Sequence, residues 1–292
     1  MIGALQAINS LQLEKFGQDN AAIFQTMANQ AAIAVENALL HKERLNNQLL
    51  NREIELASTI QSGFWPKEQP MISNYKVAGC SIPAKNVGGD YFDYISLPNK
   101  NNWGFTVADV TGKGVSAALL MATMRASLRS HLEYSNTPNI SLTKVNELIF
   151  NDSPLDKFIT AIYCELDSIK NTIRYVNAGH NNPYVLDVEK NSISTLDVGG
   201  LMLGILDTVK YDEEVYEIKS NQKLILYSDG ITEARDVKGD FYGEKRFENW
   251  LLDNKTLDPD AMVKGITEEL IHFRNEAEQS DDITIIVIQR VG

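Results

Sequence analysis

Residues 158–187 read FITAIYCELDSIKNTIRYVNAGHNNPYVLD and contain three short apolar segments, at 158–166, 172–178 and 184–187. Short polar stretches with Asn, Gly or Pro separate the segments, which is typical of turns between strands. Parallel neighbours need a long crossover, usually a helix, whereas antiparallel neighbours need only a turn. Because no helical pattern lies between these segments, they predict antiparallel sheets.

Short apolar segments also occur before and after residues 158–187. Further strands are expected at 76–81, 103–110, 224–228 and 282–288, and helical patterns occupy 116–131, 142–150, 247–252 and 259–277. Runs of strands interrupted by a few helices are typical of the α+β class. We therefore expect two antiparallel sheets with the helices covering their outer faces.

A long helix is expected before the sheets, because no Gly or Pro occurs between Ala21 and Gly63. Ala31, Ala38 and Leu45 lie seven residues apart, and Leu49 and Leu56 repeat that spacing after a step of four. This is the pattern of a short coiled-coil seam with a stutter. Two interpretations stay open: a rod that forms a homodimer, or a helix that packs on its own domain.

Composition narrows the classes of partner. The 292 residues include 27 Lys and Arg against 39 Asp and Glu, so the formal net charge is −12. Nucleic acids and anionic membranes are bound through basic patches, so neither is expected as the main partner. No apolar run approaches the ~18 residues of a membrane helix, no signal peptide is recognisable, and Cys80 and Cys164 fit neither a disulfide framework nor a zinc motif. We expect a soluble, cytoplasmic protein with reduced thiols.

Four acidic motifs are the candidates for chemistry: GGDYFD at 88–93, ADVTGKG at 108–114, YSDG at 227–230 and SDDIT at 280–284. An aspartate beside glycine is commonly only a turn residue. However, Asp109, Asp229 and Asp281 each adjoin a strongly apolar segment, so they are expected to converge at one rim of the sheets. Converging carboxylates repel one another unless a cation holds them ionised, and hard oxygen ligands suit Mg²⁺ or Mn²⁺.

Six motifs, in the order GGDYFD, DVTGKGVSAALLMA, NAGHNNP, GGLMLG, YSDGITEA and DDITIIVI, resemble the metal-dependent serine/threonine phosphatases of the PP2C superfamily (PPM). Within it, the motifs look like the bacterial SpoIIE/RsbU-type branch of sporulation and sigma-factor-regulating phosphatases. The resemblance covers about residues 50–290. It implies a four-layer α-β-β-α sandwich with a centre of two Mn²⁺ or Mg²⁺ ions at one end of the sheets.

Carried over position by position, the resemblance implies that Asp109 bridges the two ions. One ion would also be held by Asp90 and the backbone carbonyl of Val110, and the other by Asp229 and Asp281. Asp281 is favoured over Asp282 because it lies three residues before Thr284, but both stay candidates. Asp93 is expected to support Asp90 without binding metal. The residues expected to act most directly in catalysis are Asp109 and Asp229.

The implied chemistry is hydrolysis of phosphoserine or phosphothreonine by a hydroxide that bridges the two metals, with no covalent protein intermediate. The implied substrate is a phosphorylated protein, such as an anti-sigma-factor antagonist. Lys113 stands where the eukaryotic branch carries a histidine, and His180 is expected to be structural.

Two other functions are weighed against this hydrolysis. One is a catalytically silent regulatory or dimerisation module. The other is a phosphatase with an aspartyl intermediate, which is disfavoured because Tyr227 stands where the nucleophilic aspartate is needed.

The first 40 residues carry a resemblance of their own. The segment from Ile2 to Leu40 is similar to the closing strand (residues 2–9) and final helix of a GAF sensor domain. One strand and one helix cannot form a ligand pocket, so this is either a piece of a longer sensor phosphatase or a remnant. We therefore expect three parts: a GAF-like end at 1–40, a helical linker and possible coiled coil at 41–70, and a PP2C-like domain at 71–292.

Overall fold

The computed structural model describes residues 6, 17–134, 137–153 and 156–291. The chain divides into two compact units, residues 1–56 and 57–292. The first strand expected from the sequence, at 2–9, lies outside the described residues.

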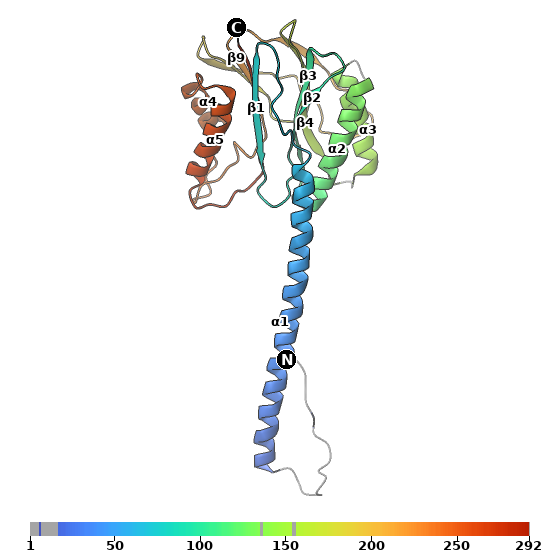
Figure 1. Cartoon of the computed structure of the whole chain (residues 1–292), viewed down its shortest axis with the longest axis vertical. Coiled ribbons are helices and arrows are strands. Elements are labelled where there is room, and N and C mark those ends of the chain that lie inside the picture. Colours follow the sequence, from blue (N-terminus) through green and yellow to red (C-terminus); the bar gives the residue numbers. More distant parts are fainter. Residues whose placement is uncertain (1–5, 7–16, 135–136, 154–155, 292) are drawn as a thin grey trace. The chain divides into compact units, whose positions relative to one another are not determined.

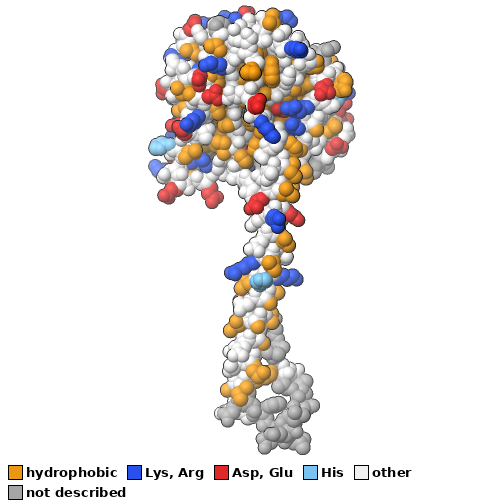
Figure 2. Space-filling view, in the orientation of Figure 1, with side chains coloured by type: hydrophobic (Ala, Val, Ile, Leu, Met, Phe, Trp, Pro, Cys, Tyr) orange, Lys and Arg blue, Asp and Glu red, His pale blue; other side chains and the backbone are white. Residues whose placement is uncertain are grey.

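Helix α1 spans Gln18–Ser62, 45 residues, and agrees with the helix expected between Ala21 and Gly63. In the part of α1 that belongs to the first unit, most large apolar side chains are exposed, and orange side chains follow this helix in Figure 2. Leu45, Leu49 and Leu56 of the predicted seam expose 48%, 63% and 62% of their surfaces.

The second unit contains two five-stranded sheets (Figure 1). The first sheet has the order β1-β10-β9-β6-β7, with β1 Tyr75–Ile82, β10 Ile283–Arg290, β9 Gln222–Tyr227, β6 Tyr184–Asp187 and β7 Ser192–Thr195. The second has the order β2-β3-β4-β5-β8, with β2 Tyr91–Ser96, β3 Asn102–Val110, β4 Ile159–Asp167, β5 Thr172–Ala178 and β8 Glu214–Glu217. Every strand pair within these sheets is antiparallel.

Four helices flank the sheets: α2 Val115–Tyr134, α3 Pro138–Asp152, α4 Glu244–Asp253 and α5 Pro259–Arg274. Two of them begin with proline, whose missing N–H costs nothing at a helix start. The α5 start is capped as well, since Asp258 Oδ1 accepts a hydrogen bond from the Ala261 N–H at 3.0 Å.

Three apolar clusters hold the layers together. The central one lies between the two sheets and includes Phe105, Ile162 and Ile286. A second joins α2 and α3 to one sheet, and a third joins α4 and α5 to the other. The predicted α-β-β-α sandwich of two antiparallel sheets, preceded by a long helix, is confirmed.

The three segments in residues 158–187 form β4, β5 and β6, but they do not form one sheet. Strands β4 and β5 pair with each other, whereas β6 crosses to the other sheet and pairs with β9. The chain turns between them at Gly179, which has a φ of +70° that glycine adopts without strain. Asn177 closes this turn by accepting from the His180 N–H and donating to the His180 carbonyl.

Both cysteines are free thiols, with Cys164 buried and Cys80 partly buried. Within the described ranges, no helix combines the length and apolar character needed to cross a membrane.

Candidate active site

Strand pairing brings the acidic motifs to one end of the sandwich. Asp90 directly precedes β2 and Asp109 lies near the end of β3, and the pairing of Tyr91 with Ala108 places these two positions side by side. In the other sheet, Asp229 follows β9 and Asp282 directly precedes β10, next to the pair of Tyr227 with Ile285. The aspartates at these strand ends therefore lie at one rim of the sheets, as the sequence predicts.

Asp90 is the most enclosed of these carboxylates, with 2% of its surface exposed. Its Oδ2 atom is buried and makes no hydrogen bond to another described residue. Burial raises the pKa of Asp90 well above its usual range, and the charges of Asp109 and Asp282 raise it further. The Thr284 and Ser228 hydroxyls have a smaller, lowering effect on this pKa. A buried carboxylate oxygen that itself accepts no hydrogen bond is a chemically suitable position for a cation.

Asp109 and Asp229 have raised pKa values for the same reasons. Burial raises the pKa of Asp109 to about 7, with added repulsion from Asp229, Asp281 and Asp282. The pKa of Asp229 is raised to about 6, first by burial and then by the negative charges of Glu233 and Asp281. The positive charge of Lys113 lowers this pKa by a smaller amount. These carboxylates are thus close enough to repel one another, and a bound divalent cation would remove that repulsion.

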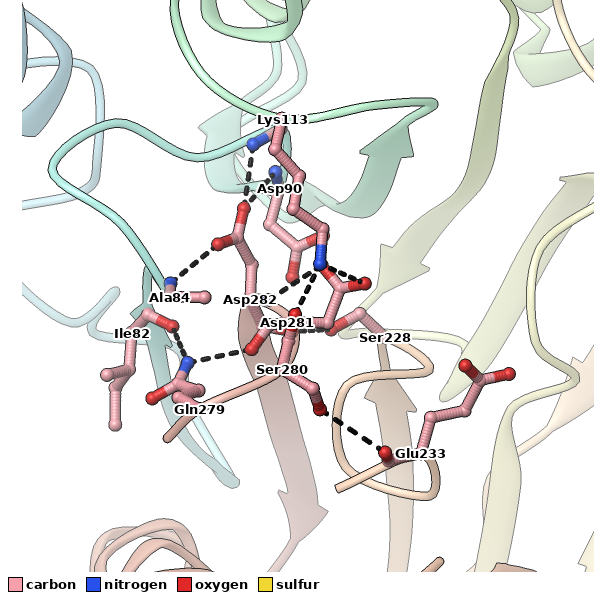
Figure 3. Close-up of polar contacts among 11 residues, drawn as sticks. Ile82, Ala84, Asp90, Lys113, Ser228, Glu233, Gln279, Ser280, Asp281 and Asp282 are labelled. Carbon is pink, nitrogen blue, oxygen red and sulfur yellow. Dashed lines mark hydrogen bonds and ion pairs between the residues drawn. The ribbon is translucent and has the colours of Figure 1, made fainter. Parts of the chain in front are cut away.

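Asp281 and Asp282 are neighbours with different surroundings (Figure 3). Asp282 is 6% exposed, and both of its carboxylate oxygens accept backbone hydrogen bonds. Oδ1 accepts from the Ala84 N–H at 2.7 Å, and Oδ2 from the N–H groups of Gly89 at 2.7 Å and Asp90 at 3.3 Å. Asp282 therefore fastens the segment that leads into Asp90, which leaves Asp281 as the better candidate ligand.

Asp281 has 38% of its side chain exposed and forms an ion pair with Lys113, at 2.9 Å between Oδ2 and Nζ. Lys113 also donates to the Ser280 carbonyl, so the loop before α2 is tied to the loop before β10. As the side chains stand, no three His, Cys, Asp or Glu residues of the described ranges are spaced to hold a single ion. A cation bound at Asp281 would therefore compete with Lys113 for the Asp281 carboxylate.

Three glycines allow the loops to approach this closely. A Cβ atom on Gly89 would lie 2.8 Å from the Val110 carbonyl oxygen, and one on Gly88 would overlap the Asp282 carboxylate. A Cβ on Gly230 would overlap the Asp282 carbonyl. The GGD and SDG motifs thus have a steric reason to contain glycine, and the carboxylate chemistry and close backbone approach both fit a cation site.

Asp93 does not have the role expected from the sequence. It forms a bidentate ion pair with Arg129 of α2, at 2.6 and 2.8 Å, and accepts a hydrogen bond from the Tyr91 hydroxyl. Side chains alternate along a strand, so Asp93 lies on the face of β2 that packs against the helices. It anchors α2 to the sheet instead of supporting Asp90.

Two residues at this end were missed by sequence reasoning. The charge of Glu233 raises the pKa of Asp229, and its place in the YSDGITEA motif was a usable signal. The other is Gln61, near the end of α1, whose amide contacts Gly88. No local pattern relates it to a motif 27 residues away.

His180 is buried, and its Nδ1 lies 2.8 Å from the Thr160 hydroxyl. Burial lowers the pKa of His180 to about 4. An unfolded histidine takes up its proton near pH 6.5, so this residue's contribution to stability is complete above that pH and is lost as the pH falls toward 4. Between about pH 6.5 and about pH 5 the loss should be on the order of 2 kcal/mol.

Urea unfolding of the parent chain and of His180→Gln, at about pH 7.5 and about pH 5, measures this contribution as the difference between the two pH dependences. The parent should lose more stability on acidification than the variant. Equal losses in both proteins would mean that His180 is not held neutral by burial.

Comparison with known proteins identifies the family of the chain. The family model described as Stage II sporulation protein E (SpoIIE) matches residues 99–291. The chain is 28% identical over 243 residues to "Phosphoserine phosphatase RsbU" of Bacillus subtilis (strain 168), covering 83% of this chain and 71% of RsbU.

Two solved structures show the same fold. The SiaA-PP2C domain of Pseudomonas aeruginosa matches with a TM-score of 0.73 and 20% identity, over 83% of this chain and 98% of that one. RsbX in complex with magnesium matches with a TM-score of 0.57 and 16% identity, over 76% and 98% of the two chains. With a family model matching two thirds of its residues, the chain belongs to the SpoIIE family of PP2C-type serine phosphatases.

Proposed function

We propose that this protein hydrolyses phosphoserine or phosphothreonine in a protein substrate, and that its activity depends on two Mn²⁺ or Mg²⁺ ions. The observation that carries the proposal is the convergence of Asp90, Asp109, Asp229 and Asp281, with burial and mutual repulsion raising the pKa of the first three. The similarity to a phosphoserine phosphatase and to a protein that binds magnesium supports it.

Each residue has a distinct part in this proposal. Asp109, Asp90 and the Val110 carbonyl would hold one ion, and Asp109, Asp229 and Asp281 would hold the other. When bound, two such ions supply a hydroxide nucleophile near neutral pH and neutralise the phosphate oxygens. Asp282 acts on the protein alone, because its carboxylate holds the backbone of Gly89 and Asp90.

The test is phosphate release from an aryl phosphate and from a phosphoserine protein, with Mn²⁺ or with EDTA. The parent chain should be active with Mn²⁺ and inactive with EDTA, and Asp229→Asn should be inactive in both. Asp253→Asn, an exposed position at the end of α4, is the matched control and should behave as the parent does. A parent chain that binds Mn²⁺ but releases no phosphate would favour the catalytically silent module.

The resemblance to the sigma-factor-regulating branch points to a substrate class. We infer that the substrate is a small protein phosphorylated on serine, of the kind that antagonises an anti-sigma factor, in a partner-switching pathway. A cytoplasmic location belongs to the same proposal.

The division into a GAF-like end at 1–40, a linker at 41–70 and a phosphatase domain at 71–292 remains a proposal, as does a homodimer through α1. The exposed apolar seam of α1 supports the dimer, since large apolar side chains gain free energy when a second helix covers them. The stutter of the predicted seam lies between Leu45 and Leu49, where the spacing is four residues instead of seven.

Replacing both Leu45 and Leu49 by Glu is therefore expected to convert a dimer into a monomer, because charged side chains do not pack in a seam. Sedimentation equilibrium of the full chain measures this. Asn47→Glu changes the charge of the same helix off the seam and should leave the mass unchanged. A parent chain that is monomeric at all concentrations would refute the dimer.

A further inference from the structure

Gln61 is a polar side chain buried near the end of α1, with 3% of its surface exposed. Both ends of its amide bind the same backbone unit. Its Nε2 donates to the Gly88 carbonyl at 2.7 Å, and its Oε1 accepts from the Gly88 N–H at 3.1 Å. The side chain thus pairs with Gly88 as a neighbouring strand would.

Gly88 belongs to the turn that carries Asp90. The next two N–H groups, of Gly89 and Asp90, donate to the Asp282 carboxylate. The turn is therefore held at successive residues, by Gln61 at Gly88 and by Asp282 at Gly89 and Asp90. Because Asp90 is buried and directly precedes β2, its carboxylate can move only as far as this turn allows.

The end of α1 is itself fixed to α2. The Phe64 N–H donates to the Gln61 carbonyl at 2.8 Å, so Phe64 closes the last turn. Arg125 of α2 lies over the Phe64 ring, 5.1 Å from its centroid, and its Nε donates to the Phe64 carbonyl at 3.3 Å. Gln61 thus reaches Gly88 from a helix end that is anchored to the protein.

Filling space alone does not explain a buried amide at this position. Removing its two polar groups from water costs free energy unless both are paired, whereas methionine fills a similar volume without that cost. The paired amide gives what methionine cannot give, a directional hold on the Gly88 backbone.

We propose that Gln61 is a positioning residue for Asp90: through Gly88 it holds the turn so that the Asp90 carboxylate is placed to receive a divalent cation. The inference rests on the metal-dependent function proposed above. It makes the end of α1 part of the support of the metal site.

The experiment compares the full parent chain with Gln61→Met, which keeps the length and loses both hydrogen bonds, and with Gln61→Glu. The Glu variant keeps the acceptor for the Gly88 N–H but sets a carboxylate oxygen against the Gly88 carbonyl. Gln25→Met, at an exposed position of α1 on the face opposite the predicted seam, is the matched control. Mn²⁺ affinity is measured by calorimetry, amide hydrogen exchange of residues 84–92 is measured without metal, and circular dichroism reports folding.

Both Gln61 variants are expected to bind Mn²⁺ more weakly by about 10- to 100-fold, the range for loss of an outer partner of a metal ligand. Amide exchange in residues 84–92 should be faster in both, and Gln25→Met should match the parent. If Gln61→Met does not fold, the Mn²⁺ affinity of Gln61→Glu is the test of the inference.

A folded Gln61 variant with the Mn²⁺ affinity of the parent would overturn the inference, even if its amides exchanged faster. In that case Gln61 would stabilise the turn without positioning Asp90, and the proposed phosphatase function would stand. If the parent chain itself bound no Mn²⁺, the proposed function would fail first, and the inference with it.

Discussion

Asp109→Asn is expected to lower Mn²⁺-dependent phosphate release by more than about 100-fold, because loss of an outer partner of a metal ligand alone costs about 10- to 100-fold. Asp109 is the carboxylate whose pKa is raised by three others, Asp229, Asp281 and Asp282, so it lies within the electrostatic reach of all of them. An amide at this position can neither carry the negative charge nor bridge two ions.

The same substitution should not weaken the metal-free fold. Burial and repulsion raise the pKa of Asp109 to about 7, so the charged carboxylate is unfavourable in the folded chain, and a neutral amide removes that cost. Phosphate release, Mn²⁺ calorimetry and urea unfolding in EDTA, each with Asp253→Asn as the control, separate the two effects. Release within a few-fold of the parent would rule out Asp109 as a bridging ligand.

Asp282→Ala and Asp281→Ala are expected to fail in different ways. Asp282→Ala leaves the N–H groups of Ala84, Gly89 and Asp90 without their acceptor. Two of these donors, Gly89 and Asp90, are buried, and each costs roughly 1–3 kcal/mol when unsatisfied, so the loss of stability should be about 2 kcal/mol, less whatever is regained because the Asp282 charge no longer repels Asp90 and Asp109. Asp281→Ala removes an ion pair between partly exposed groups, which is worth about 1 kcal/mol or less, and one part-buried hydrogen bond, which Asp281 Oδ1 accepts from the Asp282 N–H.

The effects on Mn²⁺ affinity should have the opposite order: among folded proteins, Asp281→Ala should lose more Mn²⁺ affinity than Asp282→Ala. Asp281→Ala is expected to keep its stability in EDTA and to lose Mn²⁺ affinity and phosphate release. Urea unfolding in EDTA and Mn²⁺ calorimetry on both variants make the comparison. If Asp281→Ala were as unstable as Asp282→Ala is expected to be, or bound Mn²⁺ normally, the two roles assigned here would have to be exchanged or abandoned.

Strands with strong apolar patterns were predictable from the sequence alone. The segments at 158–166, 172–178 and 184–187 correspond to β4, β5 and β6, and the four predicted helical stretches lie within or close to α2, α3, α4 and α5. Strands β7 and β8 were missed because they are short and mostly exposed, so they carry no apolar alternation. Strand β2 was hidden by the acidic motif that overlaps it.

The position of the acidic motifs was predictable because it depends on strand ends, which pairing brings together. Side-chain partners were not, because they depend on which helix packs on which face. Asp93 looked like a neighbour of Asp90 until α2 was seen to supply Arg129 on the other face of β2. Gln61 carried no signal at all, because its partner Gly88 lies far along the chain.

The claim that these carboxylates hold the ions that drive hydrolysis is tested most directly by removing and restoring metal. The chain is treated with EDTA, dialysed, and titrated with Mn²⁺ while bound metal and phosphate release from a phosphoserine protein are both measured. We predict no release before Mn²⁺ is added, and release that rises in step with the binding of about two ions per chain, as for a two-metal site. Full release by the metal-free chain would contradict the account.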